Sequence, residues 1–361
     1  MMKVLLKGPI LTQSGYGHHA RTVYRALKTR EDLFEIFIHP ITWGHTSWLW
    51  EDCEERREID KLLQKTIGHT QAGGKFDISL QVTIPNEWEK IAPINIGVTA
   101  GIETTKIAPL WFEKSLLMDK IITISHHSKT TYENTVFSVR DESGQSKEMT
   151  CPIPVEYVSY PVRKFDPEDL DLNLESDFNF LAVAQLSPRK NMEQLIRVFV
   201  DKFRENENIG LVVKANTAKN SLIDRNHTHA NFRRILEKFG PRKCKIYFLH
   251  GYLSDKQMAG LYNHPKIKAF VSTTHGEGFG LPIFEAAANG MPVAATDWSG
   301  HLDFLYMPQK QKNGKIKNKH MFNRINYTLQ KIGKESVWDG VLTEDSMWAY
   351  PEDTSVKMNL V

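Results

Sequence analysis

Short apolar runs alternate along the chain with segments in which apolar residues recur every three or four positions. The runs predict strands, and the recurring pattern predicts helices. In the first part of the chain we expect strands at 3–7, 34–38, 76–82, 94–99 and 120–124, and helices at 18–28 and 110–119. This alternation predicts a parallel β-sheet covered by helices.

A second alternating series begins at Phe178. It predicts strands at 178–184, 209–214, 245–249, 268–272 and 292–296, and helices at 191–205, 225–239, 255–263 and 282–289. Two separate series of this kind predict two doubly wound α/β domains. A chain of 361 residues is long enough to bury a core in each of them.

The segment 152–177 joins the two series and differs from them in composition. It carries four prolines and a run of acidic residues near its end, which is typical of a linker. We therefore expect an N-terminal domain at 1–164 and a C-terminal domain at 165–335. Residues 336–361 are expected to form a tail that packs back towards the N-terminal domain or is truncated.

Charge and cysteine content narrow the classes of function. The chain has 46 basic and 43 acidic residues, a net charge of +3, which argues against nucleic acid as the main partner. Cys53, Cys151 and Cys244 are widely spaced and form no C-x-x-C pair, so we expect neither a disulfide framework nor a metal site. No apolar run is long enough for a membrane span or a secretory signal, and we expect a cytoplasmic protein.

Two segments leave alternatives open. Residues 308–319 form a basic polar loop, which is either a solvated insertion or a patch for an anionic acceptor or a membrane surface. Residues 40–50 hold Trp43, Trp48 and Trp50, which form either an aromatic platform for a carbohydrate or a packed insertion.

A glycine-rich turn in the second series lies between two glutamates eight positions apart, Glu277 and Glu285. Gly278 and Gly280 let the backbone approach a ligand closely, and Pro282 suits a first helical turn. The helix start offers free N–H groups and partial positive charge, which favour phosphate. The carboxylates are suited to accept hydrogen bonds from hydroxyls. A sugar and a phosphate together predict a nucleotide sugar.

Cations follow the strands of the same series. Arg189 and Lys190 stand between a strand and a helix, where they oppose the helix dipole, and Lys214 ends the next strand. We expect them to neutralise a leaving diphosphate. In the first series, Gly15 and Gly17 lie between a strand and a helix, where a phosphate contact or a tight turn is expected.

The segment 250–255 also follows a strand and precedes a helix. Ser254 or Asp255 is expected to cap that helix. Tyr252 and the main chain at Leu253 are expected to contact a nucleotide base.

Taken in order, these motifs resemble the retaining GT-B glycosyltransferases of sequence family 4. The resemblance covers roughly residues 3–305, and the E-x7-E block, E-G-F-G-L-P-I-F-E, is its specific part. It implies an α/β fold of two facing Rossmann-like domains with an interdomain cleft. It also implies that the second domain binds the nucleotide sugar and the first binds the acceptor.

The resemblance implies that Glu285 binds the ribose, that Glu277 and the backbone at 278–280 hold the sugar and diphosphate, and that Lys190 meets the diphosphate. With the residue pattern, the candidate donor-binding set is Gly15, Gly17, Lys214, Tyr252, Leu253, Gly278, Phe279, Gly280, Leu281 and Glu285. The candidate catalytic set is Glu277, Glu103, Lys190 and Arg189.

This chain departs from the family pattern in three places. Many members carry arginine where this chain has Gln185, so Arg189 or Lys214 is expected to supply the charge. Glu103 stands where members often have a histidine pointing at the sugar, and is either a proton acceptor there or a structural acid. The usual C-terminal crossover helix is expected to be short or absent.

Together with the residue pattern, the resemblance implies a retaining, metal-independent transferase without a cofactor. It would move a sugar from a nucleoside diphosphate sugar to a hydroxyl of a glycan, lipid or small molecule. The alternatives are a phosphorylase or epimerase of the same shape, and a binding protein that lacks activity. The base, the sugar, the acceptor and the oligomeric state stay open.

Overall fold

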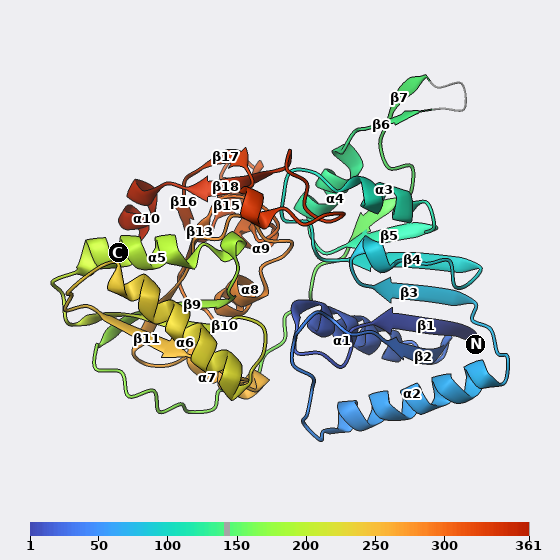
Figure 1. The fold of residues 1–361 in the computed structure, drawn as a ribbon, viewed down its shortest axis with the longest axis horizontal. Helices are drawn as coiled ribbons and strands as arrows, with labels where there is room; N and C mark the ends of the chain where they lie inside the picture. Colours follow the sequence, from blue (N-terminus) through green and yellow to red (C-terminus); the bar gives the residue numbers. More distant parts are fainter. Residues whose placement is uncertain (141–144, 361) are drawn as a thin grey trace. The chain divides into compact units, whose positions relative to one another are not determined.

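The computed structural model describes residues 1–140 and 145–360. They form two compact units (Figure 1). Unit 1 consists of Met1–Tyr160 with Val337–Ser346, and unit 2 consists of Pro161–Ser336 with the residues from Met347 onward. The stretch predicted as a tail is thus divided between the units.

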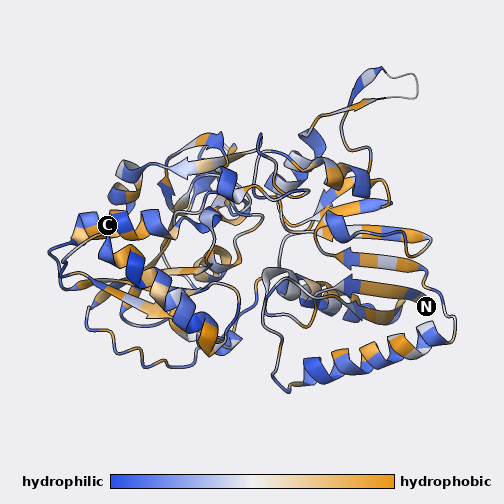
Figure 2. Ribbon diagram, in the orientation of Figure 1, coloured by the Kyte–Doolittle hydropathy of each residue, from blue (hydrophilic) through white to orange (hydrophobic). Residues whose placement is uncertain are grey.

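Unit 1 is built on a six-stranded parallel sheet of order β2-β1-β3-β4-β5-β8. Its strands are β1 (Met2–Gly8), β2 (Phe34–Pro40), β3 (Ile78–Val82), β4 (Ile94–Thr99), β5 (Lys120–Thr123) and β8 (Val155–Tyr157). Its helices are α1 (Gly15–Lys28), α2 (Glu54–Gln71), α3 (Pro109–Ser115) and α4 (His126–Asn134). The apolar runs form the buried strands, because a parallel sheet is covered on both faces (Figure 2).

The apolar pattern did not predict α4, β8 or helix α2, which is the longest of these three elements. Within it only Ile59 and Thr66 are buried, and most of its side chains are polar. Thr66 Oγ1 accepts a hydrogen bond from the backbone N–H of Ile38 at 2.9 Å, which ties the helix to strand β2. A polar side chain thus holds α2 in place where the sequence offers only a narrow apolar stripe.

Unit 2 repeats the architecture with a six-stranded parallel sheet of order β11-β10-β9-β12-β13-β16. Its strands are β9 (Phe178–Gln185), β10 (Ile209–Asn216), β11 (Lys245–Leu249), β12 (Ile267–Ser272), β13 (Val293–Thr296) and β16 (Asn323–Ile325). Its helices are α5 (Met192–Phe203), α6 (Leu222–Glu237), α7 (Asp255–Tyr262), α8 (Leu281–Ala288), α9 (Leu302–Leu305) and α10 (Asp353–Asn359). The prediction of two doubly wound α/β domains is confirmed.

Three two-stranded sheets complete the fold. They pair β6 (Phe137–Arg140) with β7 (Ser146–Met149), β14 (Tyr306–Lys310) with β15 (Ile316–His320), and β17 (Tyr327–Lys331) with β18 (Met347–Pro351). The prediction of a loop at 308–319 is wrong, because this segment forms the antiparallel β14–β15 hairpin. Its strands are largely exposed and lack the apolar run or regular alternation by which a strand is recognised in sequence.

Candidate functional site

The candidate site of unit 2 lies where parallel strands end. Lys190 follows β9 in the turn η2 (Pro188–Lys190), Lys214 lies near the end of β10, and Glu277 follows β12. Since β10, β9 and β12 are neighbours in the sheet, the loops after them lie at one edge. This edge is where open α/β sheets hold their ligands.

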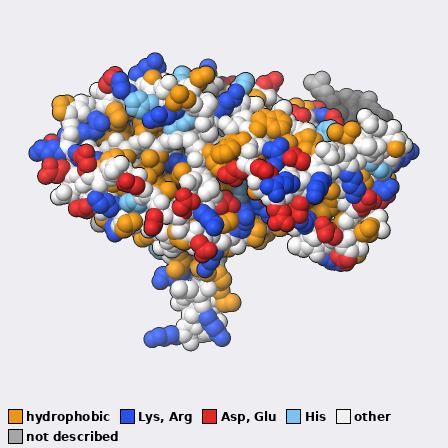
Figure 3. Space-filling model, turned by 90° about the horizontal axis from the view of Figure 1, so that it is seen from below, with side chains coloured by type: hydrophobic (Ala, Val, Ile, Leu, Met, Phe, Trp, Pro, Cys, Tyr) orange, Lys and Arg blue, Asp and Glu red, His pale blue; other side chains and the backbone are white. Residues whose placement is uncertain are grey.

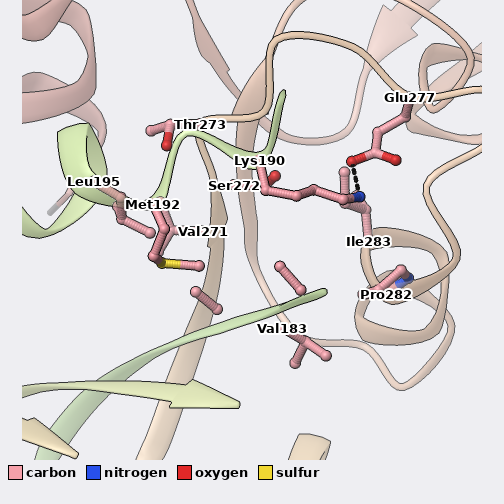
Figure 4. Close-up of a pocket in the computed structure, with 12 residues that line it drawn as sticks. Val183, Lys190, Met192, Leu195, Val271, Ser272, Thr273, Glu277, Pro282 and Ile283 are labelled. Atoms are coloured by element: carbon pink, nitrogen blue, oxygen red, sulfur yellow. Dashed lines mark hydrogen bonds and ion pairs between the residues drawn. The ribbon is translucent and has the colours of Figure 1, made fainter. Parts of the chain in front are cut away.

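Glu277 binds both candidate cations, and Figure 4 shows its contact with Lys190. Lys190 Nζ donates to Glu277 Oε1 at 2.5 Å, and Arg189 Nη1 donates to Glu277 Oε2 at 3.0 Å. The three side chains are 8%, 14% and 18% exposed for Glu277, Lys190 and Arg189. Burial alone raises the pKa of Glu277, but the charges of Lys190 and Arg189 outweigh it and lower that pKa to about 2. The carboxylate is therefore ionised throughout the neutral range.

The sequence assigned Glu277 to a sugar and the two cations to a diphosphate. The structure brings all three groups into one cluster, so each cation has a carboxylate partner. Arg189 Nη1 also donates to the carbonyl of Gly276 at 2.6 Å, which fixes its guanidinium beside the turn. A sugar hydroxyl or a phosphate oxygen that binds here would contact side chains that already form ion pairs with one another.

The loop 297–301 fixes the backbone of Glu277. The sequence pattern gave this loop no definite role. The backbone N–H of Glu277 donates to Ser299 Oγ at 2.8 Å, and the N–H of Gly300 donates to the carbonyl of Glu277 at 2.9 Å. Ser299 has φ +88°, an unusual value for a residue with a side chain. This backbone conformation was not visible in the sequence, because serine does not signal it.

Helix α8 begins at the glycine-rich turn, as predicted. Gly280 precedes it with φ +89°, and Pro282 lies in its first turn. A Cβ atom on Gly280 would lie 3.1 Å from Cβ of His301, so both conformation and space require glycine.

We expect Gly280→Ala to lower the free energy of unfolding by about 1 kcal/mol more than Gly290→Ala. Gly290 also has a positive φ, +77°, but a Cβ there would meet nothing within 4 Å. Urea unfolding of both variants measures the difference. Equal losses would show that the contact with His301 carries no cost.

Glu285 lies on α8, one turn below its start. Tyr262 donates its hydroxyl to Glu285 Oε2 at 2.9 Å. Burial raises the pKa of Glu285 to about 7, against the lowering effects of the Tyr262 hydrogen bond and the Lys214 charge. Lys214 Nζ donates to the carbonyl of Gly251 at 3.0 Å, and burial lowers its pKa. The second glutamate of the motif thus titrates near neutrality, unlike Glu277.

If Glu285 accepts hydrogen bonds from ribose hydroxyls, affinity for a nucleoside diphosphate is expected to rise as the pH increases through about 7. The raised pKa also means that the carboxyl stabilises the fold below its ordinary pKa of 4.5, and that this stabilisation is lost as the pH rises through about 7. Calorimetric titration with nucleoside diphosphates and thermal unfolding across this range measure both effects. Glu285→Gln should flatten both profiles, and an unchanged profile would contradict the assignment.

The loop 250–255 is fixed at both ends. Ser254 caps α7 with Gln257 in a reciprocal capping box, which confirms the predicted capping role. His250 Nε2 and Asp224 Oδ2 are 2.8 Å apart, and Asp224 also accepts from the backbone N–H groups of Thr217 and Ala218. This His–Asp pair joins the first turn of α6 to the loop after β11, and the sequence pattern did not predict it. Tyr252 and Leu253 lie in the loop that it orders.

The candidate residues of unit 1 lie at the ends of β1 and β4. Ser14 caps α1 by accepting from the N–H of Gly17 at 2.9 Å, and a Cβ on Gly17 would collide with the carbonyl of Thr12. Gly17 is therefore required by packing, whereas Gly15 has open space around its Cα. Glu103 is half-buried in the loop after β4. Burial raises the pKa of Tyr16, and the charge of Glu103 adds to that rise.

The remaining residues singled out in the sequence have different surroundings in the structure. Gln185 Nε2 donates to the carbonyl of Thr217 at 3.1 Å, so it serves the loop after β10. Trp43 packs on Tyr16 with ring centroids 4.4 Å apart, whereas Trp48 and Trp50 are 48% and 73% exposed. Within residues 1–140 and 145–360, no group of three or more His, Cys, Asp or Glu side chains is placed to hold a metal ion.

Part of the chain is similar to proteins of known family. Residues 164–314 match the family model of glycosyl transferases group 1. The matched residues include Arg189, Lys190, Lys214, Glu277 and Glu285 of the unit 2 site.

Curated relatives align with part of the chain. A serotype-specific mannosyltransferase WbdA of Escherichia coli is 30% identical over 121 residues, which are 33% of this chain and 13% of that protein. A probable sucrose-phosphate synthase of Thermosipho melanesiensis is 29% identical over 145 residues, or 39% of this chain and 31% of that protein. The aligned segments thus span less than a third of either relative.

Solved structures show the same fold over most of the chain. Anabaena HepE, crystallised in complex with UDP and glucose, has a TM-score of 0.52 at 15% identity, covering 86% of this chain and 84% of that one. At this identity the likeness shows the fold, and the predicted GT-B class is confirmed. Among the described residues, no helix is both long and apolar enough to cross a membrane.

Proposed function

We propose that this protein is a glycosyltransferase that moves a sugar from a nucleoside diphosphate sugar to a hydroxyl acceptor. The observation that carries the proposal is the buried cluster of Glu277, Lys190 and Arg189 beside the start of α8, within the residues that match the family model. The curated names of the aligned relatives, a mannosyltransferase and a sucrose-phosphate synthase, support sugar transfer. The UDP and glucose bound by HepE support a nucleotide sugar as donor.

Each group of the cluster has a distinct part in the proposed transfer. When the bond between sugar and diphosphate breaks, negative charge grows on the leaving phosphate oxygen, and Lys190 and Arg189 stabilise it. The helix dipole at the start of α8 adds to this stabilisation. Glu277 accepts hydrogen bonds from the sugar hydroxyls and keeps both cations in place. Glu285 accepts from the ribose.

We further propose that the transfer retains the configuration at the sugar carbon and needs no metal ion. The two cations and the helix start supply positive charge that a metal ion supplies in other transferases. Unit 1 would bind the acceptor at the carboxyl ends of its strands, with Glu103 as the group that accepts the hydroxyl proton. Gly15 opens the helix at that edge.

The proposal is tested by incubating the protein with a panel of nucleoside diphosphate sugars and measuring release of free nucleotide. We expect slow release with at least one donor, and no release with Glu277→Ala. If the unaltered protein binds a donor but releases no nucleotide, the proposed enzymatic activity is wrong and the protein is a nucleotide-sugar-binding protein. Retained configuration in a product, determined by NMR, tests the stereochemical part separately.

A further inference from the structure

The β14–β15 hairpin carries a concentration of positive charge that the proposed transfer does not use. The segment 304–334 holds eight lysine or arginine residues and no aspartate or glutamate. Five of them, Lys310, Lys312, Lys315, Lys317 and Lys319, lie in the hairpin or its turn, and all five are exposed. Because the whole chain carries a net charge of only +3, this segment is a local basic surface in a nearly neutral protein.

Apolar side chains are exposed among these lysines. Ile316 is 72% exposed, and Met307 and Met321 are each 53% exposed. The strand register places Ile316 opposite Lys310, and Met307 opposite Lys319. Residues paired in this way lie on the same face of a two-stranded sheet. Each face of the hairpin therefore presents an apolar side chain beside a lysine.

The base of the hairpin is firmly attached to unit 2. Tyr306 donates its hydroxyl to Asp297 Oδ1 at 2.8 Å and packs edge-on against Phe322, which is buried. The N–H of Met321 donates to the carbonyl of Leu305 at 2.8 Å. In Figure 3 the hairpin forms the narrow projection at the lower edge, with lysine side chains at its tip. A fixed base and an extended tip present the charged and apolar side chains away from the core.

We propose that the β14–β15 hairpin docks the protein on a bilayer that contains anionic lipids. Lysines near such a surface are attracted to lipid phosphates, and exposed apolar side chains between them enter the interface. Lysine on the exposed strands also protects their edges from pairing with other strands, but that role gives no reason for Ile316 and Met307 to be exposed. A soluble polyanion would interact with the lysines alone. The exposed Ile316 and Met307 side chains therefore favour a bilayer as the binding partner.

The test is cosedimentation with vesicles of phosphatidylcholine alone or mixed with phosphatidylglycerol. We expect the protein to sediment with the mixed vesicles and to stay in the supernatant when only neutral vesicles are present. High salt is expected to release it from the mixed vesicles. The double variant Lys317→Ala/Lys319→Ala should lower binding on the order of tenfold or more. Ile316→Ser should lower it severalfold without changing the charge.

A matched control removes the same charge elsewhere in unit 2. Lys238 and Lys243 are each paired with a glutamate, Glu193 and Glu205, so Lys238→Ala/Lys243→Ala should leave vesicle binding unchanged. Thermal unfolding of each variant shows that the fold is intact, since the altered side chains are exposed. No turnover is measured, so the result is independent of the proposed transfer.

Three outcomes overturn the proposal. The first is an absence of binding to the mixed vesicles, and the second is binding that the hairpin and control variants lower equally. The third is binding that needs the lysines, ignores Ile316→Ser and is matched by binding to heparin, which would assign the hairpin to a soluble polyanion.

Discussion

Glu277→Gln is expected to lower the rate of sugar transfer by at least about a hundredfold while the protein still binds the free nucleoside diphosphate. Glutamine keeps the shape of the side chain but loses the charge that holds Lys190 and Arg189. The two cations no longer share their charge with a carboxylate at position 277, so binding of the diphosphate alone is expected to be retained or tightened. Steady-state kinetics and calorimetric titration measure the two effects on one preparation.

The same substitution also tests the energetics of the cluster. Removing one partner of a largely buried charge group leaves the cations uncompensated, and we expect a loss of about 1–3 kcal/mol in the free energy of unfolding. Because the pKa of Glu277 is lowered to about 2, its contribution is present above its ordinary pKa of 4.5 and is lost as the pH falls towards 2. Glu193→Gln is the control, since that glutamate pairs with Lys238 on the surface. A Glu277→Gln protein with normal transfer would refute the role assigned to this carboxylate.

Lys190→Ala is expected to have the opposite effect on the free nucleotide, weakening its binding by about ten- to hundredfold. Lys190 is the strongest of the charges that lower the pKa of Glu277, so the same variant should raise that pKa. Calorimetric titration with a series of nucleoside diphosphates gives the affinity, and Lys190→Arg should restore part of it because the positive charge is kept.

Lys238→Ala is the matched control for this variant, because it removes a lysine of unit 2 whose glutamate partner is on the surface. Its nucleotide affinity should be that of the unaltered protein. Equal affinity of Lys190→Ala and the unaltered protein would mean that the phosphate is bound elsewhere. The double variant Glu277→Gln/Lys190→Ala should lose less stability than the sum of the single losses, because the two groups are in direct contact.

The sequence determined the architecture because the apolar pattern is strong where strands are buried on both faces. The strand at Phe178 and its neighbours lie within a few residues of their predicted positions. The helix predicted at 282–289 is observed as α8 one residue earlier, at Leu281–Ala288, since a glycine with positive φ and a proline in the first turn favour a helix start there. Where burial is narrow or absent, the pattern failed: α2 was missed, and the basic hairpin was taken for a loop.

The sequence by itself thus determined the two α/β units, the glycine-rich helix start and the types of residue at the edge of the second sheet. Only the tertiary structure decided that Glu277 is shared by Lys190 and Arg189, and that Glu285 and Glu277 have pKa values on opposite sides of their ordinary value. The physical reason is that periodicity reports burial along one segment, whereas a pKa depends on charges brought in from distant segments. Residues 189 and 277 are far apart in the chain, and only the pairing of β9 with β12 brings their charges together.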